Sequence, residues 1–444
     1  MSEGQEMALG QQADPQIVAQ FGLYDNPAMQ KFIDEKGQQM AAISHRNNIK
    51  YEFKILDSPV LNAFAVPGGY VYFTRGIMAH FNNEAQFAGV LGHEIGHIAA
   101  RHSAQQQSKA ILAQVGLIAG MVIAPELAQF GDLASQGLGL LFLKFGRDAE
   151  RESDRLGVEY STKIGYDADE MADFFLTLQR KQQESGSALP EFLSTHPDPG
   201  NRYTTVNELA AEWQKKLNAT KLEVGRNSYL RMIDGIIYGE DPKQGFVENQ
   251  VFYHPELKFQ FPIPANWSYL NSPQVFQMAP KDGNAMMNLT LAPGKTLQEA
   301  AQQTMQQYKL TPVQSANVTV NGLPALAVIA DQQQQQATIR TLTYFIEYGG
   351  NIYSLMGISS AQNFNSYAKL FTNTMESFRE LTDPSKLNKQ PERVRIKTVK
   401  QTGTLAQALQ AYTKDTKRLE EFAVLNGMQL EDRVEQGTLI KVVE

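Results

Sequence analysis

Two histidines and a glutamate are the residues best placed to do chemistry, and they lie in the stretch 83–102, NEAQFAGVLGHEIGHIAARH. His93 and His97 are four residues apart, so on an α-helix both imidazoles project from one side and can bind a single metal ion. Glu94 follows the first histidine, where its carboxylate can serve as general base on a metal-bound water. Apolar residues recur at helical spacing, and the pair Asn83–Gln86 predicts a capped start. The pattern therefore predicts a helix carrying two metal ligands and a base.

A catalytic zinc ion needs a third protein ligand, with one position left for water. The metzincin extension requires a glycine and a histidine where this chain has Ala100 and Ser103, and His102 is one residue short, so that geometry fails. The other option is a glutamate on a later helix. Glu150 and Asp154 lie at i and i+4 on one face of a charged helix. Glu150 can then bind the metal while Asp154 accepts the free N–H of a ligating histidine.

The elements that must position these groups begin with helix over residues 1–46 and a strand at 49–56. Residues 60–74 follow as a hairpin around the turn Pro67-Gly68-Gly69. Its first arm is predicted to be an exposed or edge strand that docks an extended peptide by β-augmentation, and an ordinary hairpin is an equal alternative. The candidate substrate-binding residues are Asn62, Ala63, Phe64, Ala65 and Val66.

Residues 103–145 are rich in glycine and alanine and are expected to form two helical pieces around Pro125. Three interpretations stay open: core helices, a lid over the active cleft, or a peripheral contact with a membrane surface. The longest apolar run, 110–124, is short for a membrane span. Further helices are predicted at 146–164, 168–182 and 204–217, with a turn at 193–202 that carries His196.

Composition narrows the class of protein. The chain has 444 residues, room for about three domains. Its net charge is −7 and it has no long basic run, which argues against nucleic acid as a partner. The absence of cysteine excludes disulfides, thiol catalysis and cysteine-ligated zinc. No signal peptide is visible, so we expect either a cytoplasmic protein or a mature segment.

From residue 251 the pattern changes to alternating strands with two helices, at 297–308 and 364–378, as in an α+β domain. Residues 381–392 read as a linker. Residues 393–444 predict a small β-α-α-β unit compact enough for a binding module.

Three further segments, taken with the H-E-x-x-H helix, resemble one known family. GRDAERESDRLG, at 146–157, resembles the S-R-x-x-E-x-x-A-D-r-l-G segment of gluzincin metallopeptidases related to the CaaX prenyl endopeptidase. LNAFAVPGGYVYFTRGIM, at 61–78, resembles that family's N-A-F-A-x-P-G-G strand, and LSTHPDPGNR, at 193–202, its S-T-H-P-x-x-x-x-R turn. The motifs occur in the family's order, and Gly146 and Ser153 depart from its usual serine and alanine.

The resemblance implies one zinc ion per chain, bound by His93, His97 and Glu150, with Glu94 as the general base. Behind the ligands it implies Asp154 and Arg147 as supporting groups.

The resemblance places His196 near the metal, where it stabilises the oxyanion or occupies the open zinc position. The implied activity is that of a zinc metalloendopeptidase of the soluble, exported bacterial branch, periplasmic or outer-membrane-associated. Such an enzyme would hydrolyse unfolded or misfolded envelope proteins in quality control. The alternative is a zinc-bound periplasmic chaperone or assembly factor whose protease activity is latent and blocked by a lid.

The later segments carry weaker resemblances. YHPELKFQFPIPANW is similar to the start of a PsbP/Mog1-like α/β sandwich, and TGTLAQALQAY, LNGM and QGTLIKVV resemble a LysM-like module, which implies a contact with peptidoglycan. The expected fold class is α+β, with a mostly helical zincin-like domain and small sheet at 1–250, a sandwich at 251–380, a linker at 381–392 and a module at 393–444.

Overall fold

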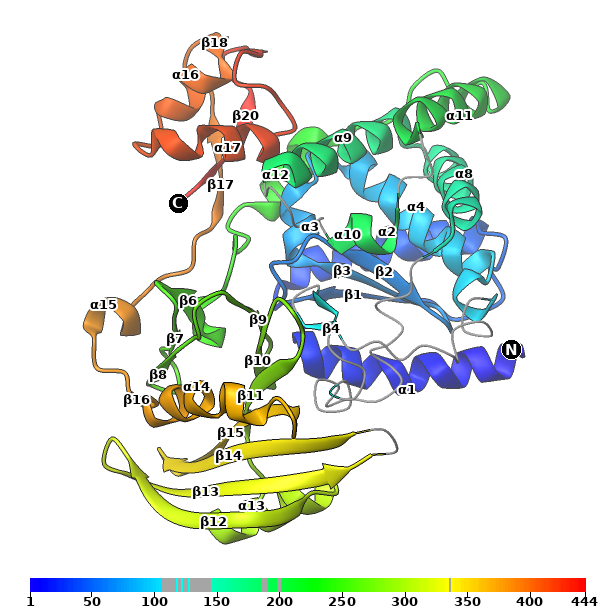
Figure 1. The fold of residues 1–444 in the computed structure, drawn as a ribbon. Coiled ribbons are helices and arrows are strands. Elements are labelled where there is room, and N and C mark those ends of the chain that lie inside the picture. The colour runs from blue at the N-terminus through cyan, green and yellow to red at the C-terminus, as the bar shows by residue number, and fades with distance from the viewer. Residues whose placement is uncertain are drawn as a thin grey trace. The chain divides into compact units, whose positions relative to one another are not determined.

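A computed structural model gives the arrangement of the chain (Figure 1). It describes residues 1–105, 117–118, 121–122, 127, 145–184, 191–197, 201–334 and 337–444. The chain forms two compact units. The first comprises Met1–Ile111, Gln136–Gly239 and Pro391–Glu444, and the second Leu112–Ser135 and Glu240–Gln390. The mixture of helices and sheets confirms the α+β class.

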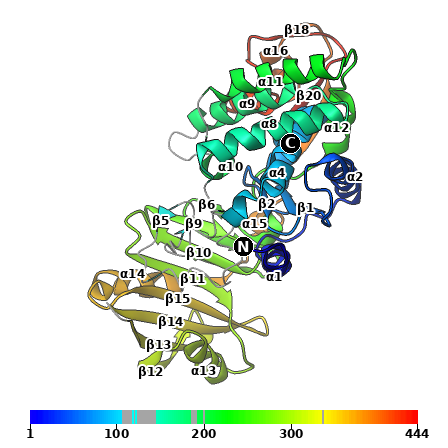
Figure 2. The ribbon, with the colours of Figure 1, turned by 90° about the vertical axis from the view of Figure 1, so that its right-hand side faces the viewer.

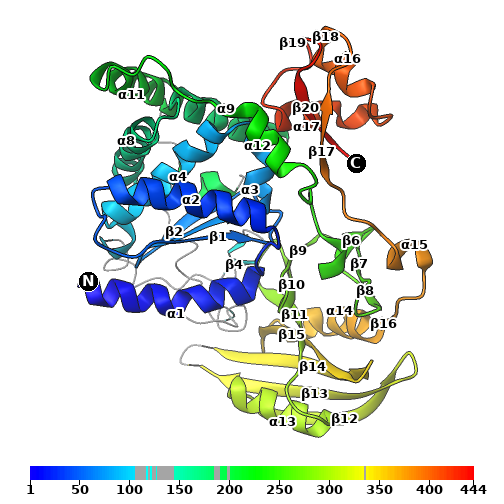
Figure 3. The same ribbon diagram turned by 180° about the vertical axis from the view of Figure 1, so that it is seen from behind.

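Two capped helices open the first unit, as the amphipathic pattern predicted. In α1 (Glu3–Phe21), Ser2 and Gln5 form a reciprocal capping box. In α2 (Pro27–Ile43), the side chain of Asn26 accepts a hydrogen bond from the Met29 N–H, and the proline occupies the first turn. Figure 3 shows both helices alongside the small sheet of this unit.

That sheet has three strands in the order β1-β3-β2. The strands are β1 (Glu52–Leu56), β2 (Ala63–Val66) and β3 (Tyr70–Thr74). The predicted hairpin is present, since β2 pairs antiparallel with β3. Gly69 in its turn has φ +98°, and a Cβ there would lie 2.1 Å from the Lys50 carbonyl oxygen, so only glycine fits. Strand β2 lies at an edge among the described strands, which confirms the edge alternative of the prediction, while all four of its residues are buried, which contradicts the exposed alternative.

The alternation of side chains along β2 and β3 divides the core between two faces. Phe64, Val66 and Tyr72 pack with α1, in a cluster that includes Ile17. The opposite face belongs to the main core, shared with α2 and the helices that follow. These are α3 (Arg75–His80), α4 (Glu84–Ala99), α8 (Arg147–Lys163), α9 (Asp169–Glu184), α10 (Glu191–Thr195), α11 (Arg202–Lys216) and α12 (Arg226–Ile233).

Helices α4 and α8 approach closely because glycines line their contact. A Cβ on Gly92 would lie 2.8 Å from the Gly157 carbonyl oxygen, and one on Gly157 would lie 2.9 Å from the His93 backbone nitrogen. Any side chain at either position would push the helices apart. The face of α8 that carries Glu150 is thereby held against the face of α4 that carries the histidines.

Most of the segment predicted as a lid, core helices or membrane contact, residues 103–145, lies outside the described residues. Within it the structure gives only the short strands β4 (Leu117–Ile118) and β5 (Met121–Val122) and a few flanking residues. In the part of the chain that the structure describes, no helix has both the length and the apolar character needed to cross a membrane.

The C-terminal segment has the predicted β-α-α-β order, but it is part of the first unit. Its elements are β17 (Val394–Thr398), β18 (Gly403–Thr404), α16 (Leu405–Gln410), the 3-10 helix η4 (Thr416–Arg418), α17 (Leu419–Leu425), β19 (Arg433–Val434) and β20 (Leu439–Val443). Its apolar residues join the same core as α4 and α9. Lys441 is fully buried, and its ammonium group donates to the carbonyl oxygens of Ala79 and Phe81, at 2.9 and 3.0 Å.

The second unit contains a seven-stranded antiparallel sheet in the order β12-β13-β14-β15-β11-β10-β9. Its strands are β9 (Trp267–Asn271), β10 (Val275–Pro280), β11 (Ala285–Leu291), β12 (Thr311–Val320), β13 (Leu323–Gln333), β14 (Thr338–Tyr348) and β15 (Asn351–Ser360). Helix α13 (Leu297–Gln307) packs on one face and α14 (Phe364–Glu376) on the other (Figure 2).

A smaller sheet completes the second unit, in the order β16-β8-β7-β6. Its strands are β6 (Phe246–Glu248), β7 (Val251–His254), β8 (Phe259–Pro262) and β16 (Arg379–Glu380). Because β6 pairs with β7, the first unit ends at Gly239 rather than at the predicted residue 250. The 3-10 helix η3 (Pro242–Gln244) precedes this sheet, and the predicted linker contains the short helix α15 (Pro384–Leu387).

Candidate metal centre

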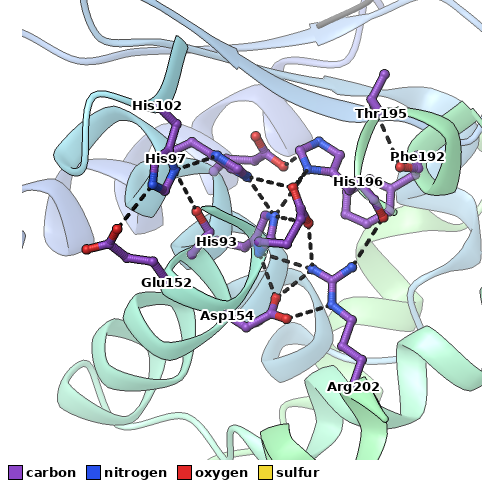
Figure 4. Close-up of polar contacts among 12 residues, drawn as sticks. His93, His97, His102, Glu152, Asp154, Phe192, Thr195, His196 and Arg202 are labelled. Carbon is purple, nitrogen blue, oxygen red and sulfur yellow. Dashed lines mark hydrogen bonds and ion pairs between the residues drawn. The ribbon is translucent and has the colours of Figure 1, made fainter. Parts of the chain in front are cut away.

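Helix α4 presents the two histidines of the H-E-x-x-H pattern on one buried side, as their spacing requires. Asn83 caps the helix, its side chain accepting from the Gln86 N–H. The Nε2 atoms of His93 and His97 lie 3.0 Å apart, and both side chains are buried. Both imidazoles therefore face one point in the core (Figure 4).

Helix α8 and the end of α10 bring two more groups to that point. A carboxylate oxygen of Glu150 lies 3.4 Å from Nε2 of His97, and the other lies 3.5 Å from Nε2 of His93. His196, directly after α10, places Nδ1 3.2 Å from Nε2 of His93 and 3.1 Å from Glu150. The four donor atoms all lie within 4.8 Å of one another.

This donor set fits a zinc ion. A tetrahedral site with bonds of about 2.0–2.1 Å separates its ligand atoms by about 3.3 Å, close to the separations found here. Nδ1 of His93 lies 2.9 Å from the Asp154 carboxylate and donates its proton there, so Nε2 carries a lone pair. That lone pair faces a second imidazole and the carboxylate of Glu150, an arrangement that a bound cation stabilises. Among the described residues, this cluster of histidines and carboxylates is the one able to hold a metal ion.

The electrostatics of the cluster keep His93, His97 and Glu150 in the protonation states that bind metal. For His196, burial acts to lower the pKa, but Glu150 and Glu94 outweigh it and raise that pKa. Burial acts to raise the pKa of Glu150, but His196 and His93 outweigh it and hold that pKa well below its usual range. Burial lowers the pKa of both His93 and His97, which favours the neutral imidazoles. A carboxylate with neutral imidazoles is the form in which these residues bind zinc.

Glu94 lies beside the cluster with its carboxylate poorly paired. It is fully buried, and neither oxygen has a well-formed hydrogen bond among the described residues. One oxygen lies 3.5 Å from Nε2 of His196, which has no hydrogen-bond partner there either. Burial raises the pKa of Glu94 to about 8, against smaller effects of His196 and the backbone N–H of Ala65 that lower it. A carboxylate with a pKa near neutrality can both take and return a proton.

The backbone of β2 next to Glu94 has hydrogen-bonding groups that point away from β3, in the plane of the sheet. The Thr74 N–H donates to the Asn62 carbonyl oxygen at 3.0 Å, so these two residues form a hydrogen-bonded pair across the hairpin. In an antiparallel ladder such pairs alternate, so the N–H and C=O groups of Ala63 and Ala65 face the edge of β2 that pairs with no other described strand, where the Ala65 N–H lies against the Glu94 carboxylate. The side-chain oxygen of Asn62 is also buried without a partner among the described residues.

The sequence that builds this site is similar to a known protein family. Residues 27–210 match the model of Peptidase family M48. The matched segment runs from α2 to α11 and includes every predicted site residue. The match of this segment to Peptidase family M48 supports the activity of a metalloprotease.

Curated relatives of the M48 segment are named as proteases. The chain is 32% identical over 222 residues to the beta-barrel assembly-enhancing protease of Escherichia coli, covering 47% of this chain and 45% of the relative. It is 32% identical over 181 residues to the mitochondrial metalloendopeptidase OMA1 of Arabidopsis thaliana, covering 40% of this chain and 35% of the relative. The chain thus spans less than half the length of these two relatives.

Similarity to solved structures is low over the whole chain. Cyanobacterial PsbP from Synechocystis is 10% identical, with 30% of this chain and 91% of that chain covered, at a TM-score of 0.25. The Ran-binding protein Mog1p of Saccharomyces cerevisiae is 9% identical, with coverage of 32% and 99%, at 0.24. Scores this low do not assign a fold, so the PsbP/Mog1-like middle domain stays a prediction.

One support of the M48 segment differs from the prediction. Arg147 is exposed at the first residue of α8, so the prediction that it supports the ligands is wrong. Arg202 takes that place: it is buried and donates to the Asp154 carboxylate at 2.6 and 2.8 Å and to Glu150 at 3.3 Å. The signal for Arg202 was present in the sequence, since it is the final arginine of the turn that carries His196.

Proposed function

We propose that this protein is a zinc-dependent endopeptidase that cleaves unfolded or misfolded proteins of the bacterial envelope. The observation that supports it best is the convergence of three predicted zinc ligands, His93, His97 and Glu150, with a buried, poorly hydrogen-bonded glutamate and an edge strand among the described strands. The relatives named as beta-barrel assembly-enhancing proteases support an activity in the bacterial envelope, in the periplasm or at the outer membrane under this proposal.

Substrate would lie extended along β2. The outward N–H and C=O groups of Ala63 and the C=O group of Ala65 can pair with a peptide backbone by β-augmentation, and Asn62 offers a buried acceptor next to them. Phe64 and Val66 point to the α1 face and serve the core instead. Pairing through the backbone tolerates many side-chain sequences, which suits unfolded substrates.

Zinc, when bound, supplies Lewis acidity and lowers the pKa of a coordinated water. Glu94 takes the proton of the attacking water on its carboxylate and delivers it to the leaving amine. The Nε2 atom of His196, 3.5 Å from Glu94, can donate to the oxygen of the carbonyl under attack. Asp154 and Arg202 hold His93 in the tautomer that leaves Nε2 free.

Replacing Glu94 by glutamine tests the proposal directly. The variant should bind zinc as the wild type does, because Glu94 is not among the proposed ligands, and cleave unfolded casein at least about a hundredfold more slowly. Zinc content by atomic absorption and casein cleavage are the two measurements. Cleavage by Glu94→Gln at the wild-type rate would contradict the proposed chemistry.

One observation favours a second candidate, a zinc-bound assembly factor with latent protease activity. Nδ1 of His196 lies as close to His93 and Glu150 as the proposed ligands lie to one another, so His196 can occupy the position that water needs. In that case His196→Ala would cleave casein faster than the wild type. If His196 instead assists catalysis, the same variant would be slower.

The remaining parts of the proposal concern the whole chain. The C-terminal segment would contact peptidoglycan, as its predicted LysM-like character implies. Binding of the full chain to purified peptidoglycan sacculi, measured by co-sedimentation, tests that contact separately from proteolysis.

A further inference from the structure

A fourth histidine lies against the candidate metal centre without belonging to the donor set. His102 follows α4, immediately after Arg101, whose φ of +59° turns the chain sharply at the end of the helix. The turn brings the His102 ring back onto α4. Its Nδ1 lies 3.0 Å from Nδ1 of His97, and the side chain is only 5% exposed (Figure 4).

The far side of the same ring meets an acid on α8. Nε2 of His102 lies 3.2 Å from a carboxylate oxygen of Glu152, and the Ser153 hydroxyl lies 3.3 Å from Nδ1. Glu152 points away from the face of α8 that carries Glu150, so it does not reach the donor cluster directly. The hydrogen-bonded series His97–His102–Glu152 therefore connects a proposed zinc ligand to a partly exposed carboxylate.

Only one distribution of protons satisfies both hydrogen bonds of this series, His97 to His102 and His102 to Glu152, and also leaves His97 able to bind metal through Nε2. His97 must then carry its proton on Nδ1 and donate it to Nδ1 of His102. His102 in turn carries its proton on Nε2 and donates it to the Glu152 carboxylate. In this state each imidazole nitrogen of the series that lies outside the metal site has a hydrogen-bond partner. The Nε2 lone pair of His97 faces Glu150 and His93.

The other histidine of α4 is held in a comparable way. His93 donates from Nδ1 to Asp154, whose carboxylate is bound by Arg202. Each α4 histidine thus has its outer nitrogen fixed by a partner that is itself held by a charged group. We propose that His102 and Glu152 are positioning residues that set the tautomer and ring orientation of His97 for zinc binding, an inference that rests on the proposed metal site.

Zinc affinity of the full-length chain tests this proposal without relying on proteolysis. The variants are His102→Phe, which fills the space but can neither accept nor donate a hydrogen bond, His102→Gln, which can accept one from His97 and donate one to Glu152, and Glu152→Gln. Asp148→Asn is the matched control, since it removes an acid from the same helix at a side chain that is 99% exposed. Affinity is measured by competition with a chelator, and the absorption spectrum of the cobalt-loaded protein reports ligand geometry.

His102→Phe should bind zinc about 10–100-fold more weakly and change the cobalt spectrum, with His102→Gln recovering most of both. Glu152→Gln should weaken binding by a smaller factor, and Asp148→Asn should match the wild type. Thermal unfolding of the metal-free proteins identifies a variant that fails to fold, in which case Glu152→Gln and His102→Gln decide the question.

Two failures are distinguishable. If the wild type binds no zinc, the proposed function itself is wrong. If the wild type binds zinc but all His102 and Glu152 variants bind it within twofold of the wild type, only the positioning role is overturned.

Discussion

Among single residues, Arg202 links the two carboxylates that support the candidate metal centre. Its guanidinium group lies between the carboxylates of Asp154 and Glu150 and stacks over the Phe175 ring at 3.9 Å. Removing a buried cation leaves its anionic partners uncompensated, at a cost of about 3–5 kcal/mol. The positive charge acts on both the proposed ligand Glu150 and the carboxylate of Asp154 that binds His93.

Arg202→Met should therefore lose about 3–5 kcal/mol of unfolding free energy in the metal-free protein and bind zinc about 10–100-fold more weakly. Urea unfolding and chelator competition measure the two effects. Arg147→Met is the control, because Arg147 is exposed and should change neither quantity. Equal effects of the two substitutions would refute the assignment of Arg202.

His80 gives the first unit a dependence on pH that is separate from the metal centre. Its Nδ1 donates to the Gly76 carbonyl oxygen at 2.8 Å, and its Nε2 is buried without a partner among the described residues. Burial lowers the pKa of His80 to about 3, from an ordinary value near 6.5. Below pH 6.5 the His80 imidazole becomes protonated in the unfolded chain, whereas in the folded chain it stays neutral until about pH 3.

Stability should therefore be fully present above pH 6.5 and fall by up to about 1.4 kcal/mol per unit as the pH drops from 6.5 toward 3. His80→Gln removes this term, so urea midpoints of that variant should depend less steeply on pH in this range. The control is His45→Gln, whose side chain is 56% exposed. A slope unchanged in His80→Gln would show that the histidine does not resist protonation.

Among the secondary-structure elements, β2 is both a buried strand of the core and the strand proposed to pair with substrate. The alternation that directs Phe64 toward α1 directs the N–H of Ala63 toward the open edge. Because that N–H is not part of the ladder to β3, a proline at this edge position removes a donor for substrate while sparing the hairpin.

Ala63→Pro should lower kcat/KM for unfolded casein about tenfold or more, the loss expected for one or two backbone hydrogen bonds. Zinc content and the unfolding temperature should stay near wild type. Ala63→Gly is the matched control, since it keeps the N–H and should retain most of the activity. Equal cleavage of casein by the proline and glycine variants would contradict the proposed pairing of substrate with β2.

At the scale of the whole molecule, the C-terminal segment is tied to the core of the first unit. The buried ammonium group of Lys441 binds the carbonyl oxygens at the end of α3, and Arg226 donates to the carbonyl oxygen of Leu439 at 3.1 Å. Arg180 of α9 donates to the Met428 carbonyl oxygen at 2.6 Å. These buried and partly buried contacts make the segment a structural part of the unit that holds the candidate metal centre.

Lys441→Met should lower the unfolding free energy of the first unit by roughly 2–3 kcal/mol, because it leaves buried carbonyl groups without their donor. Lys414→Met, at an exposed lysine of the same segment, should have little effect. Urea unfolding followed by a probe in the first unit measures both. Equal stability of the two variants would indicate that the segment folds independently of the core.

Local spacing in the sequence determined the parts of this protein that depend on one element at a time. The four-residue period placed His93 and His97 together on α4 and Glu150 and Asp154 together on α8. The turn at Pro67-Gly68-Gly69 determined the hairpin. The helical character of the N-terminal region and the order of elements in the C-terminal segment also followed from periodicity.

Only the tertiary structure decided which residues from separate elements meet. Arg202 rather than Arg147 reaches Asp154, because α11 packs against α8 while the first residue of α8 faces solvent. Packing likewise buried β2, placed His102 against His97 and set Lys441 into the core. Periodicity predicts the face on which a side chain lies, but which element covers that face depends on contacts between residues far apart in the chain.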